Sequence, residues 1–272
     1  MPGRGATGGM AGDGPRVELA ERAARRGAEV ATARFREAVA VESKGHKNDL
    51  VTAADAAAQE AVVETIEEER PGESIVGEEN HRAGAVPETG PSWIVDPIDG
   101  TTNYARGMRM WATSVAAMVD GRPVAAATVQ PAMGDAFVAD ETGVRRNGDP
   151  VAVSDSNDPE TFLAAVNGWH PAADNRPYTD LIESAVDRFA DVRRFGSMQS
   201  SLAAVAAGSL DAHLTKRTPE PWDSVAGAYM VEQAGGTVTD IDGNPWRYDS
   251  EGLVASNGRA HETVLAAVRA TR

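Results

Sequence analysis

Two carboxylates stand three residues apart at the end of an apolar run in residues 93–103, Trp-Ile-Val-Asp-Pro-Ile-Asp-Gly-Thr-Thr-Asn. The run is typical of a strand, and Pro97 interrupts its regular ladder because proline has no amide hydrogen to donate. At such a corner Asp96 and Asp99 repel each other unless a cation lies between them, and Mg²⁺ is a cation that prefers oxygen ligands. Gly100 lets the backbone approach a ligand closely, and the amides after it would open a helix, where an anion is favoured. The stretch therefore predicts a metal beside a phosphate.

A second acidic cluster, Val76-Gly77-Glu78-Glu79-Asn80, lies shortly upstream. It follows a short apolar segment, residues 74–76, so its glutamates are expected at another strand end. A Glu-Glu pair alone is typical of a solvated loop, and an Asp-Gly pair alone is typical of a turn before a capped helix. The two acidic clusters together favour a metal site, with Glu78 in it and Glu79 either behind it or in solvent.

Three motifs in a fixed order resemble the inositol monophosphatase family. They are Gly77-Glu78-Glu79, residues 93–103 as quoted above, and Trp222-Asp223-Ser224-Val225-Ala226-Gly227. Residues 44–55 are also similar to the family's lead-in to its second helix, and the resemblance extends from there to the C-terminal helix. It implies an α/β fold, the layered αβαβα sandwich, and a Mg²⁺-dependent, lithium-sensitive phosphatase that acts on inositol monophosphate or a related sugar phosphate.

The resemblance implies two or three Mg²⁺ ions in one site and assigns their ligands by position. Glu78, Asp96 and the carbonyl of Ile98 would hold the first ion. Asp96, Asp99 and Asp223 would hold the second, and Glu78 would face a weaker third ion through water. For Asp223 the alternative is an ordinary acidic residue near a helix N-terminus, where the helix dipole favours it.

The same resemblance implies that the nucleophile is a metal-bound water oriented by Glu78 and Thr101. Asp55, in the position of an aspartate of the family's second helix, would hold the threonine hydroxyl and help to remove the proton. The alternative for Asp55 is a capping role alone, since Thr52 and Asp55 are spaced like a capping box.

Substrate contacts are expected from both halves of the chain. The resemblance places Gly196-Ser197-Met198 against the sugar, with Met198 where a small residue is common. The other expected substrate contacts come from Asp99, Gly100, Thr101 and Asp223.

The loop over residues 215–221 departs from the pattern of the inositol-specific members of the family. A glutamate of those members contacts the ring hydroxyls, whereas here no acid clearly takes that place, although Glu220 is close. Lys216 and Arg217 form a compact basic pair that would meet a second phosphate, and the alternative is an exposed loop. The departure keeps fructose 1,6-bisphosphate open as the main substrate.

Two other functions stay open. A 3′-phosphatase of adenosine 3′,5′-bisphosphate would need a surface for base stacking, and the aromatic platform available for it is Trp169 with His170. A non-catalytic protein that regulates a partner through a retained phosphatase fold belongs to another class. The full set of acidic residues argues against that class as the sole function.

Composition excludes several classes of protein. The chain has 272 residues, no cysteine and a formal net charge of −15, so it can form no disulfide or thiolate metal site and would repel a nucleic acid. No apolar run is long enough to span a membrane, and we expect a cytoplasmic homodimer whose partner is a small phosphate ester. Of the 26 basic residues only Lys44, Lys47 and Lys216 are lysines, and this acidic, lysine-poor composition predicts adaptation to high salt.

The chain is predicted to consist of a glycine-rich disordered tail over residues 1–14, an α+β half over residues 15–150 with most metal ligands, and an α/β half over residues 151–272 with substrate contacts and the last ligand. A first helix is predicted over residues 17–41, a second from about Thr52, and a hairpin later in the first half. Strands and helices then alternate to the C-terminus, which favours a layered α/β structure.

Overall fold

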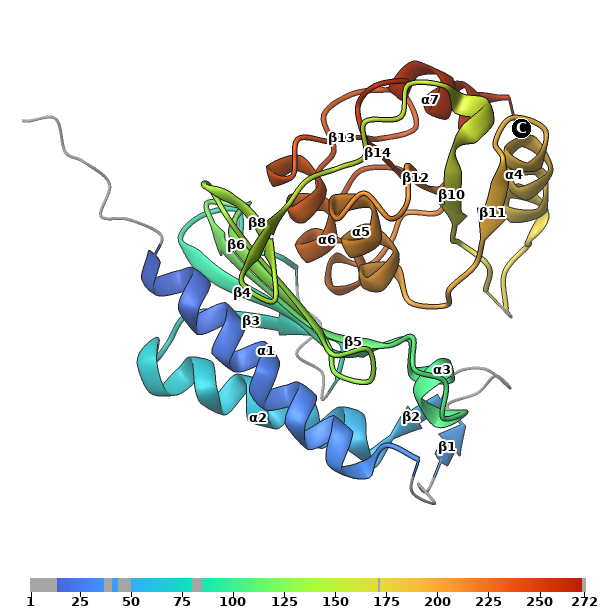
Figure 1. Ribbon diagram of the computed structural model, residues 1–272. Coiled ribbons are helices and arrows are strands. Elements are labelled where there is room, and N and C mark those ends of the chain that lie inside the picture. Colours follow the sequence, from blue (N-terminus) through green and yellow to red (C-terminus); the bar gives the residue numbers. More distant parts are fainter. Residues whose placement is uncertain (1–13, 37–40, 44–49, 80–84, 171, 271–272) are drawn as a thin grey trace, which may run out of the picture.

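The computed structural model describes residues 14–36, 41–43, 50–79, 85–170 and 172–270. A seven-stranded sheet and a five-stranded sheet alternate with layers of helices (Figure 1). This arrangement confirms the layered α/β sandwich that the sequence predicts. Within the described residues, no helix combines the length and the apolar character that a membrane span requires.

The seven-stranded sheet follows chain order, so each strand pairs with its neighbours in sequence. Its strands are β3 (Ser74–Gly77), β4 (Pro91–Asp99), β5 (Ala112–Val119), β6 (Arg122–Gln130), β7 (Asp135–Asp140), β8 (Gly143–Arg146) and β9 (Asp149–Val151). β3 and β4 are parallel and the later pairs are antiparallel. The β5–β6 hairpin is the predicted one, and Asp120 in its turn adopts a left-handed φ of 50°.

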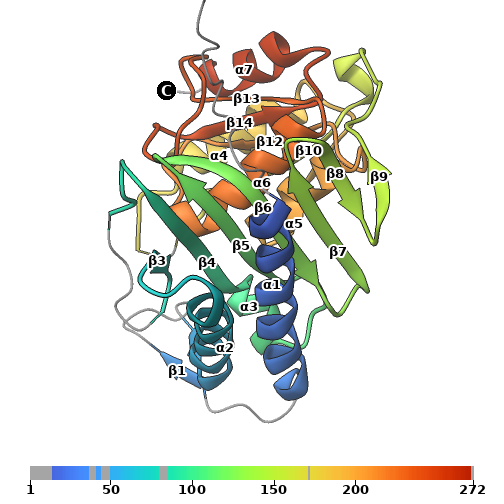
Figure 2. The ribbon, with the colours of Figure 1, turned by 90° about the vertical axis from the view of Figure 1, so that its left-hand side faces the viewer.

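Two helices cover one face of this sheet (Figures 1 and 2). They are α1 (Gly14–Arg34) and α2 (Ala53–Glu69), and a short hairpin of β1 (Val41–Ser43) and β2 (Leu50–Thr52) accompanies them. Leu19 of α1 and Ile66 of α2 are buried there against Trp93 of β4. The second helix begins where the sequence predicts.

The first helix ends earlier than its periodicity predicts. The prediction extended it to residue 41, but α1 ends at Arg34, and Arg36 leaves the helical conformation with a left-handed φ of 67°. Phe35 packs instead against Tyr104 and Trp111, with ring centroids 5.4 Å away from each. The aromatic cluster, rather than the pattern of apolar residues along the helix, therefore determines where the chain turns.

The five-stranded sheet has the order β11, β10, β12, β14, β13. Its strands are β10 (Leu163–Val166), β11 (Asp191–Arg193), β12 (Ala212–Thr215), β13 (Thr237–Thr239) and β14 (Leu253–Ser256). The remaining helices are α3 (Thr101–Ala105), a 3₁₀ turn (Pro159–Thr161), α4 (Arg176–Val186), α5 (Met198–Ala206), α6 (Pro221–Gln233) and α7 (His261–Arg269). Helices α5 and α6 fill the space between the two sheets, and α4 and α7 cover the outer face of the smaller one (Figure 1).

Strand β4 presents alternate side chains to different layers. Trp93 and Val95 are buried against α1 and α2, whereas Ile94 is buried on the side of α5 and α6. Asp96 is in phase with Ile94 and therefore points toward α5 and α6. After Asp96 the pairing with β5 shifts and resumes at Asp99, as expected for a strand that a proline interrupts.

Candidate active site

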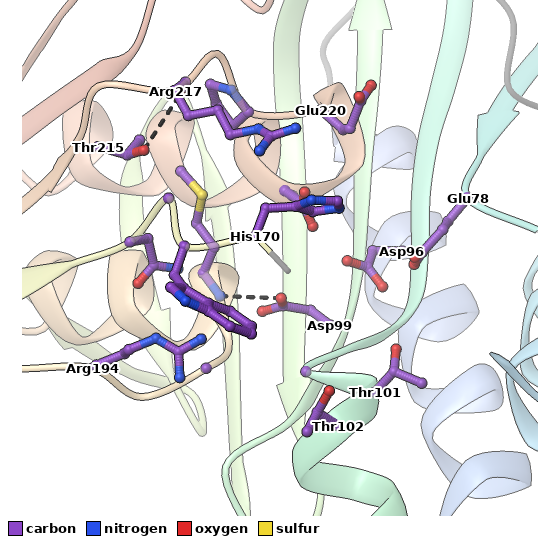
Figure 3. A pocket seen from close by; sticks show the side chains of 18 of the residues that line it. Glu78, Asp96, Asp99, Thr101, Thr102, His170, Arg194, Thr215, Arg217 and Glu220 are labelled. Carbon is purple, nitrogen blue, oxygen red and sulfur yellow. Dashed lines mark hydrogen bonds between the residues drawn. The ribbon is translucent and has the colours of Figure 1, made fainter. Parts of the chain in front are cut away.

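A cavity of about 410 Å³ opens where the end of β4 meets the first turns of α5 and α6 (Figure 3). The predicted site residues in its lining are Glu78, Asp96, Ile98, Asp99, Gly100, Thr101, Gly196, Met198 and Asp223. Asp55, Ser197 and Lys216 are not among the lining residues. Segments that are far apart in the sequence thus meet around one cavity of a size typical of small-molecule sites.

Three carboxylates lie close together at one side of the cavity. Asp96 and Asp99 come from the end of β4 and Asp223 from the first turn of α6, and each offers an oxygen within 4.8 Å of the other two. Glu78 joins them from the end of β3, because β3 runs parallel to β4 and the two strands end at the same edge (Figure 3). The site therefore concentrates negative charge from three separate elements.

Burial and mutual repulsion raise the pKa values of these carboxyl groups above those of ordinary aspartate and glutamate side chains. Burial raises the pKa of Asp99 to about 6, and burial with the nearby charges of Asp99 and Glu220 raises the pKa of Asp223 to about 8. The pKa of Asp96 is raised well above its usual range by burial and then by Glu78. Glu78 is open to the solvent of the cavity, yet the surrounding protein and the neighbouring carboxylates also raise its pKa well above its usual value.

The environment of Asp96 favours a bound cation. It is 1% exposed, and neither of its carboxylate oxygens has a hydrogen-bond donor among the residues that the structure describes. A buried carboxylate without a partner is costly, so either a proton or a positive charge must accompany it. Together with Asp99 and Asp223 it forms an all-oxygen ligand set, which fits a hard divalent cation.

Asp99 also attaches the end of β4 to α5. Its carboxylate accepts hydrogen bonds from the Ser197 hydroxyl, from the Met198 amide at 3.0 Å and from the Gln199 amide at 2.7 Å. Ser197 is 1% exposed and its hydroxyl is directed at Asp99 rather than into the cavity lining. The predicted Gly196-Ser197-Met198 segment therefore borders the cavity through its first and third residues.

Thr101, in the first turn of α3, lines the cavity. Its hydroxyl donates to the carbonyl of Ile98 at 3.1 Å. Asp55 is buried in the first turn of α2, close enough to Glu78 for its charge to raise the pKa of that carboxyl. Contact between Asp55 and Thr101 stays a prediction.

Gly100 is required by backbone packing at this corner. It has a left-handed φ of 93°, and a Cβ there would lie 3.1 Å from the carbonyl oxygens of Gly196 and Met110. Packing against these two stretches of backbone therefore requires a glycine at this position, and the close approach of a ligand stays a prediction.

The loop after β12 separates the predicted basic pair. Arg217 lines the cavity, as does Glu220, whereas Lys216 is half-buried outside the lining. Trp169 and His170, the residues considered for base stacking, also line the cavity.

Sequence reasoning missed two buried glutamines that hold the acidic residues in place. The Gln199 side chain donates to the carbonyl of Trp222 at 2.6 Å and accepts from the amide of Gly227 at 2.7 Å, so α5 fixes the turn of α6 that carries Asp223. The Gln59 side chain of α2 donates to the carbonyl of Glu79 and accepts from its amide. The only local signal for either glutamine is a polar residue within an otherwise apolar helix. This signal does not indicate which backbone groups the side chain binds.

Comparison with known proteins places the chain among phosphatases of one family. A model of the inositol monophosphatase family matches residues 15–272. The chain is 32% identical over 259 residues to Nus factor SuhB of Salmonella typhimurium, with 94% of this chain and 96% of that protein covered. It is 30% identical over 250 residues to inositol-1-monophosphatase of Bacillus subtilis, with 91% and 94% covered.

Two proteins of Thermotoga maritima are also similar. One, named fructose-1,6-bisphosphatase/inositol-1-monophosphatase, is 32% identical over 229 residues, with 84% of this chain and 86% of that protein covered. The solved structure of an IMPase from the same organism superposes with a TM-score of 0.85 at 29% identity, with 94% of this chain and 97% of that one covered. The fold is therefore that of the solved IMPase.

The metal-free protein is expected to lose stability as pH rises from about 5 to about 8. The pKa values of Asp99 and Asp223, about 6 and about 8, lie above those of an unfolded chain, so the native state holds more protons and the free energy of unfolding falls with pH. Melting temperatures in EDTA across this range test the expectation. An added divalent cation should restore stability at the upper end, and a melting temperature that rises with pH in EDTA would contradict it.

Replacing Gln199 with Leu is expected to destabilise the protein by about 2–4 kcal/mol, because the carbonyl of Trp222 and the amide of Gly227 would remain buried without partners. Urea denaturation measures the change. Gln233→Leu is the matched control, since Gln233 ends α6 and its side chain has no hydrogen bond to a described residue. Equal losses in the two variants would show that the Gln199 hydrogen bonds contribute nothing specific.

Proposed function

The chain belongs to the inositol monophosphatase family, and we propose that this phosphatase depends on Mg²⁺ and hydrolyses inositol monophosphate or a related sugar phosphate. The observation that carries the proposal is the cluster of Asp96, Asp99 and Asp223, whose oxygens lie within 4.8 Å of one another while Asp96 has no described hydrogen-bond donor. A phosphate dianion can approach this acidic wall only if cations neutralise it.

Divalent cations would occupy the positions that the ligand set provides. Glu78, Asp96 and the Ile98 carbonyl would hold one, and Asp96, Asp99 and Asp223 would hold a second, with a weaker third facing Glu78. Bound there, Mg²⁺ neutralises phosphoryl charge and lowers the pKa of water. Oxygen-only ligands favour Mg²⁺ over zinc, which more often takes nitrogen and sulfur ligands.

The side chains themselves would position the reactants. The carboxylate of Glu78 and the hydroxyl of Thr101 would orient the attacking water. Asp55, which is buried in the first turn of α2, would hold the Thr101 hydroxyl and help to remove the proton of the water. Gly100, Thr101, Gly196 and Met198 would contact the substrate on the remaining sides.

Three alternatives keep specific support. The Thermotoga maritima relative carries fructose-1,6-bisphosphatase in its name, which favours that activity as an additional or main one. The name Nus factor of the Salmonella typhimurium relative supports a regulatory role through a protein partner, but the complete carboxylate set argues that such a role accompanies catalysis. The position of Trp169 and His170 in the lining keeps adenosine 3′,5′-bisphosphate on the list of substrates to test.

Asp96→Asn and Asp223→Asn are each expected to lower kcat/KM for inositol 1-phosphate by at least about 100-fold, because each removes a ligand of the cation that neutralises the phosphate. The same changes should raise the melting temperature of the metal-free protein near pH 8, since each removes a charge from a crowded acidic site. Steady-state kinetics and melting in EDTA provide the two readouts.

Asp149→Asn, an exposed aspartate of β9, is the control and should change neither quantity. Near wild-type turnover by either site variant at saturating Mg²⁺ would refute the metal assignment. A panel of phosphate esters with and without Mg²⁺ separates the candidate substrates, and no turnover of any of them would leave the regulatory role.

We also propose that the protein is a cytoplasmic homodimer and that it is adapted to high salt. Light scattering tests whether the protein forms a dimer. The basis of the salt proposal is the net charge of −15 with three lysines among 26 basic residues. Salt screens self-repulsion, so the melting temperature should fall markedly when the protein is moved from molar KCl to dilute buffer. A melting temperature that is independent of salt would rule out the adaptation.

A further inference from the structure

A second cavity, of about 400 Å³, lies toward the other end of α6 from the acidic cluster, and we call it the distal cavity. Three segments form it: the turn of the β5–β6 hairpin, one face of α6, and the loop over residues 245–248 between β13 and β14. Asp223 lies in the first turn of α6 and Glu232 in the last, which places them about 14 Å apart along the helix axis. The linings of the two cavities share no residue.

Three aromatic side chains line the distal cavity: Tyr229, Trp246 and Tyr248. The Tyr229 hydroxyl donates to a backbone carbonyl at 2.9 Å, and the Trp246 indole N–H donates to another at 3.1 Å, so the fold fixes both rings in place. Aromatic faces attract cations. The protein already uses this attraction here, because the guanidinium carbon of Arg247 lies 5.5 Å from the centroid of the Tyr248 ring.

Two opposite charges line the distal cavity without neutralising each other, Glu232 of α6 and Arg122 at the start of β6. Among the described residues no hydrogen bond or ion pair engages either side chain, whereas Arg247 pairs with Asp249 at 3.3 Å. Glu232 is open to the solvent of the cavity, yet the surrounding protein removes part of its hydration and raises its pKa. A cation beside this carboxylate would therefore be stabilised more than one in bulk water.

The lining restricts what the distal cavity can hold. One carboxylate among aromatic and apolar side chains offers too few oxygen ligands for a divalent metal ion. A simple anion would leave Glu232 and the rings without a partner, and a neutral apolar molecule would leave both charges without one. A molecule that carries an organic cation and a separate anionic group satisfies all of these side chains, and a cavity of this volume suits a small molecule.

We propose that the distal cavity binds a small zwitterion, with its organic ammonium group at Glu232 and the aromatic rings and its carboxylate at Arg122. The proposal goes beyond the phosphatase function and does not depend on it, because no residue of the acidic cluster lines this cavity.

Isothermal titration calorimetry with γ-butyrobetaine, a trimethylammonium carboxylate, tests the site at one fixed salt concentration and saturating Mg²⁺. Two analogues of the same shape separate its charges: 5,5-dimethylhexanoate has carbon in place of the ammonium nitrogen, and butyltrimethylammonium lacks the carboxylate. The zwitterion is expected to bind at least about ten-fold more tightly than either analogue, the effect of one charge-assisted contact.

The variants should divide these probes by charge. Glu232→Gln should weaken γ-butyrobetaine and butyltrimethylammonium about ten-fold and leave 5,5-dimethylhexanoate unchanged, whereas Arg122→Gln should weaken γ-butyrobetaine and 5,5-dimethylhexanoate and leave the cation unchanged. Glu183→Gln and Arg176→Gln are the matched controls, since both residues are exposed on α4 outside the cavity, and neither should change any affinity.

Asp96→Asn identifies which cavity holds the cation. The variant should bind γ-butyrobetaine as the wild type does, and a loss of affinity would place the cation at the acidic cluster and overturn the proposal. No measurable binding of γ-butyrobetaine, or equal affinity for γ-butyrobetaine and 5,5-dimethylhexanoate, would also overturn it. None of these outcomes bears on phosphatase activity, which the ester panel measures separately.

Discussion

The hydrogen bonds that Asp99 accepts from the first turn of α5 are the contact on which the geometry of the site depends. They fasten the end of β4, in the large sheet, to a helix that lies between the two sheets. They also limit how far burial raises the pKa of Asp99. The pKa of Asp99 rises only to about 6, because hydrogen bonds from the first residues of α5 offset part of the desolvation, whereas burial and the charges of Asp99 and Glu220 raise the pKa of Asp223 to about 8. The same carboxylate is thus both a structural cap and a candidate ligand.

Gln199 connects Asp99 to α6 through hydrogen bonds. Its amide donates to Asp99, and its side chain bonds to the backbone on both sides of Asp223, so the spacing of the two carboxylates is set by one residue of α5. The helices can lie this close because residue 227 is glycine. A Cβ there would come within 2.5 Å of Leu202. The acidic cluster is therefore a product of helix packing as much as of the motif that carries Asp99.

The sequence predicts the parts of this arrangement that are local. The order of strands and helices follows from local patterns in the chain, and so does the grouping of Glu78 with Asp96. The family resemblance alone implied that Asp223 joins them. The end of α1 could not be predicted, since it depends on Phe35 meeting rings from residues 104 and 111. The same limit applies to Arg194. The sequence does not distinguish it from Arg193, and only the pairing of the parallel strands places it in the lining of the cavity. Contacts between segments that are distant in the chain produce no periodic pattern of apolar residues from which they could be predicted.

The position of the carboxylates in the cavity would give a bound cation a role in orientation as well as in rate. Asp96, Asp99 and Asp223 lie close together at one side of the cavity, whereas Arg194 and Arg217 line it elsewhere. In the proposed function, a divalent cation held by the carboxylates would make their side of the cavity the stronger site for a phosphate dianion. Asp96 and Asp99 come from β4 of the larger sheet, whereas the two arginines follow β11 and β12 of the smaller one, so the packing of the two sheets fixes the distance between the two sides.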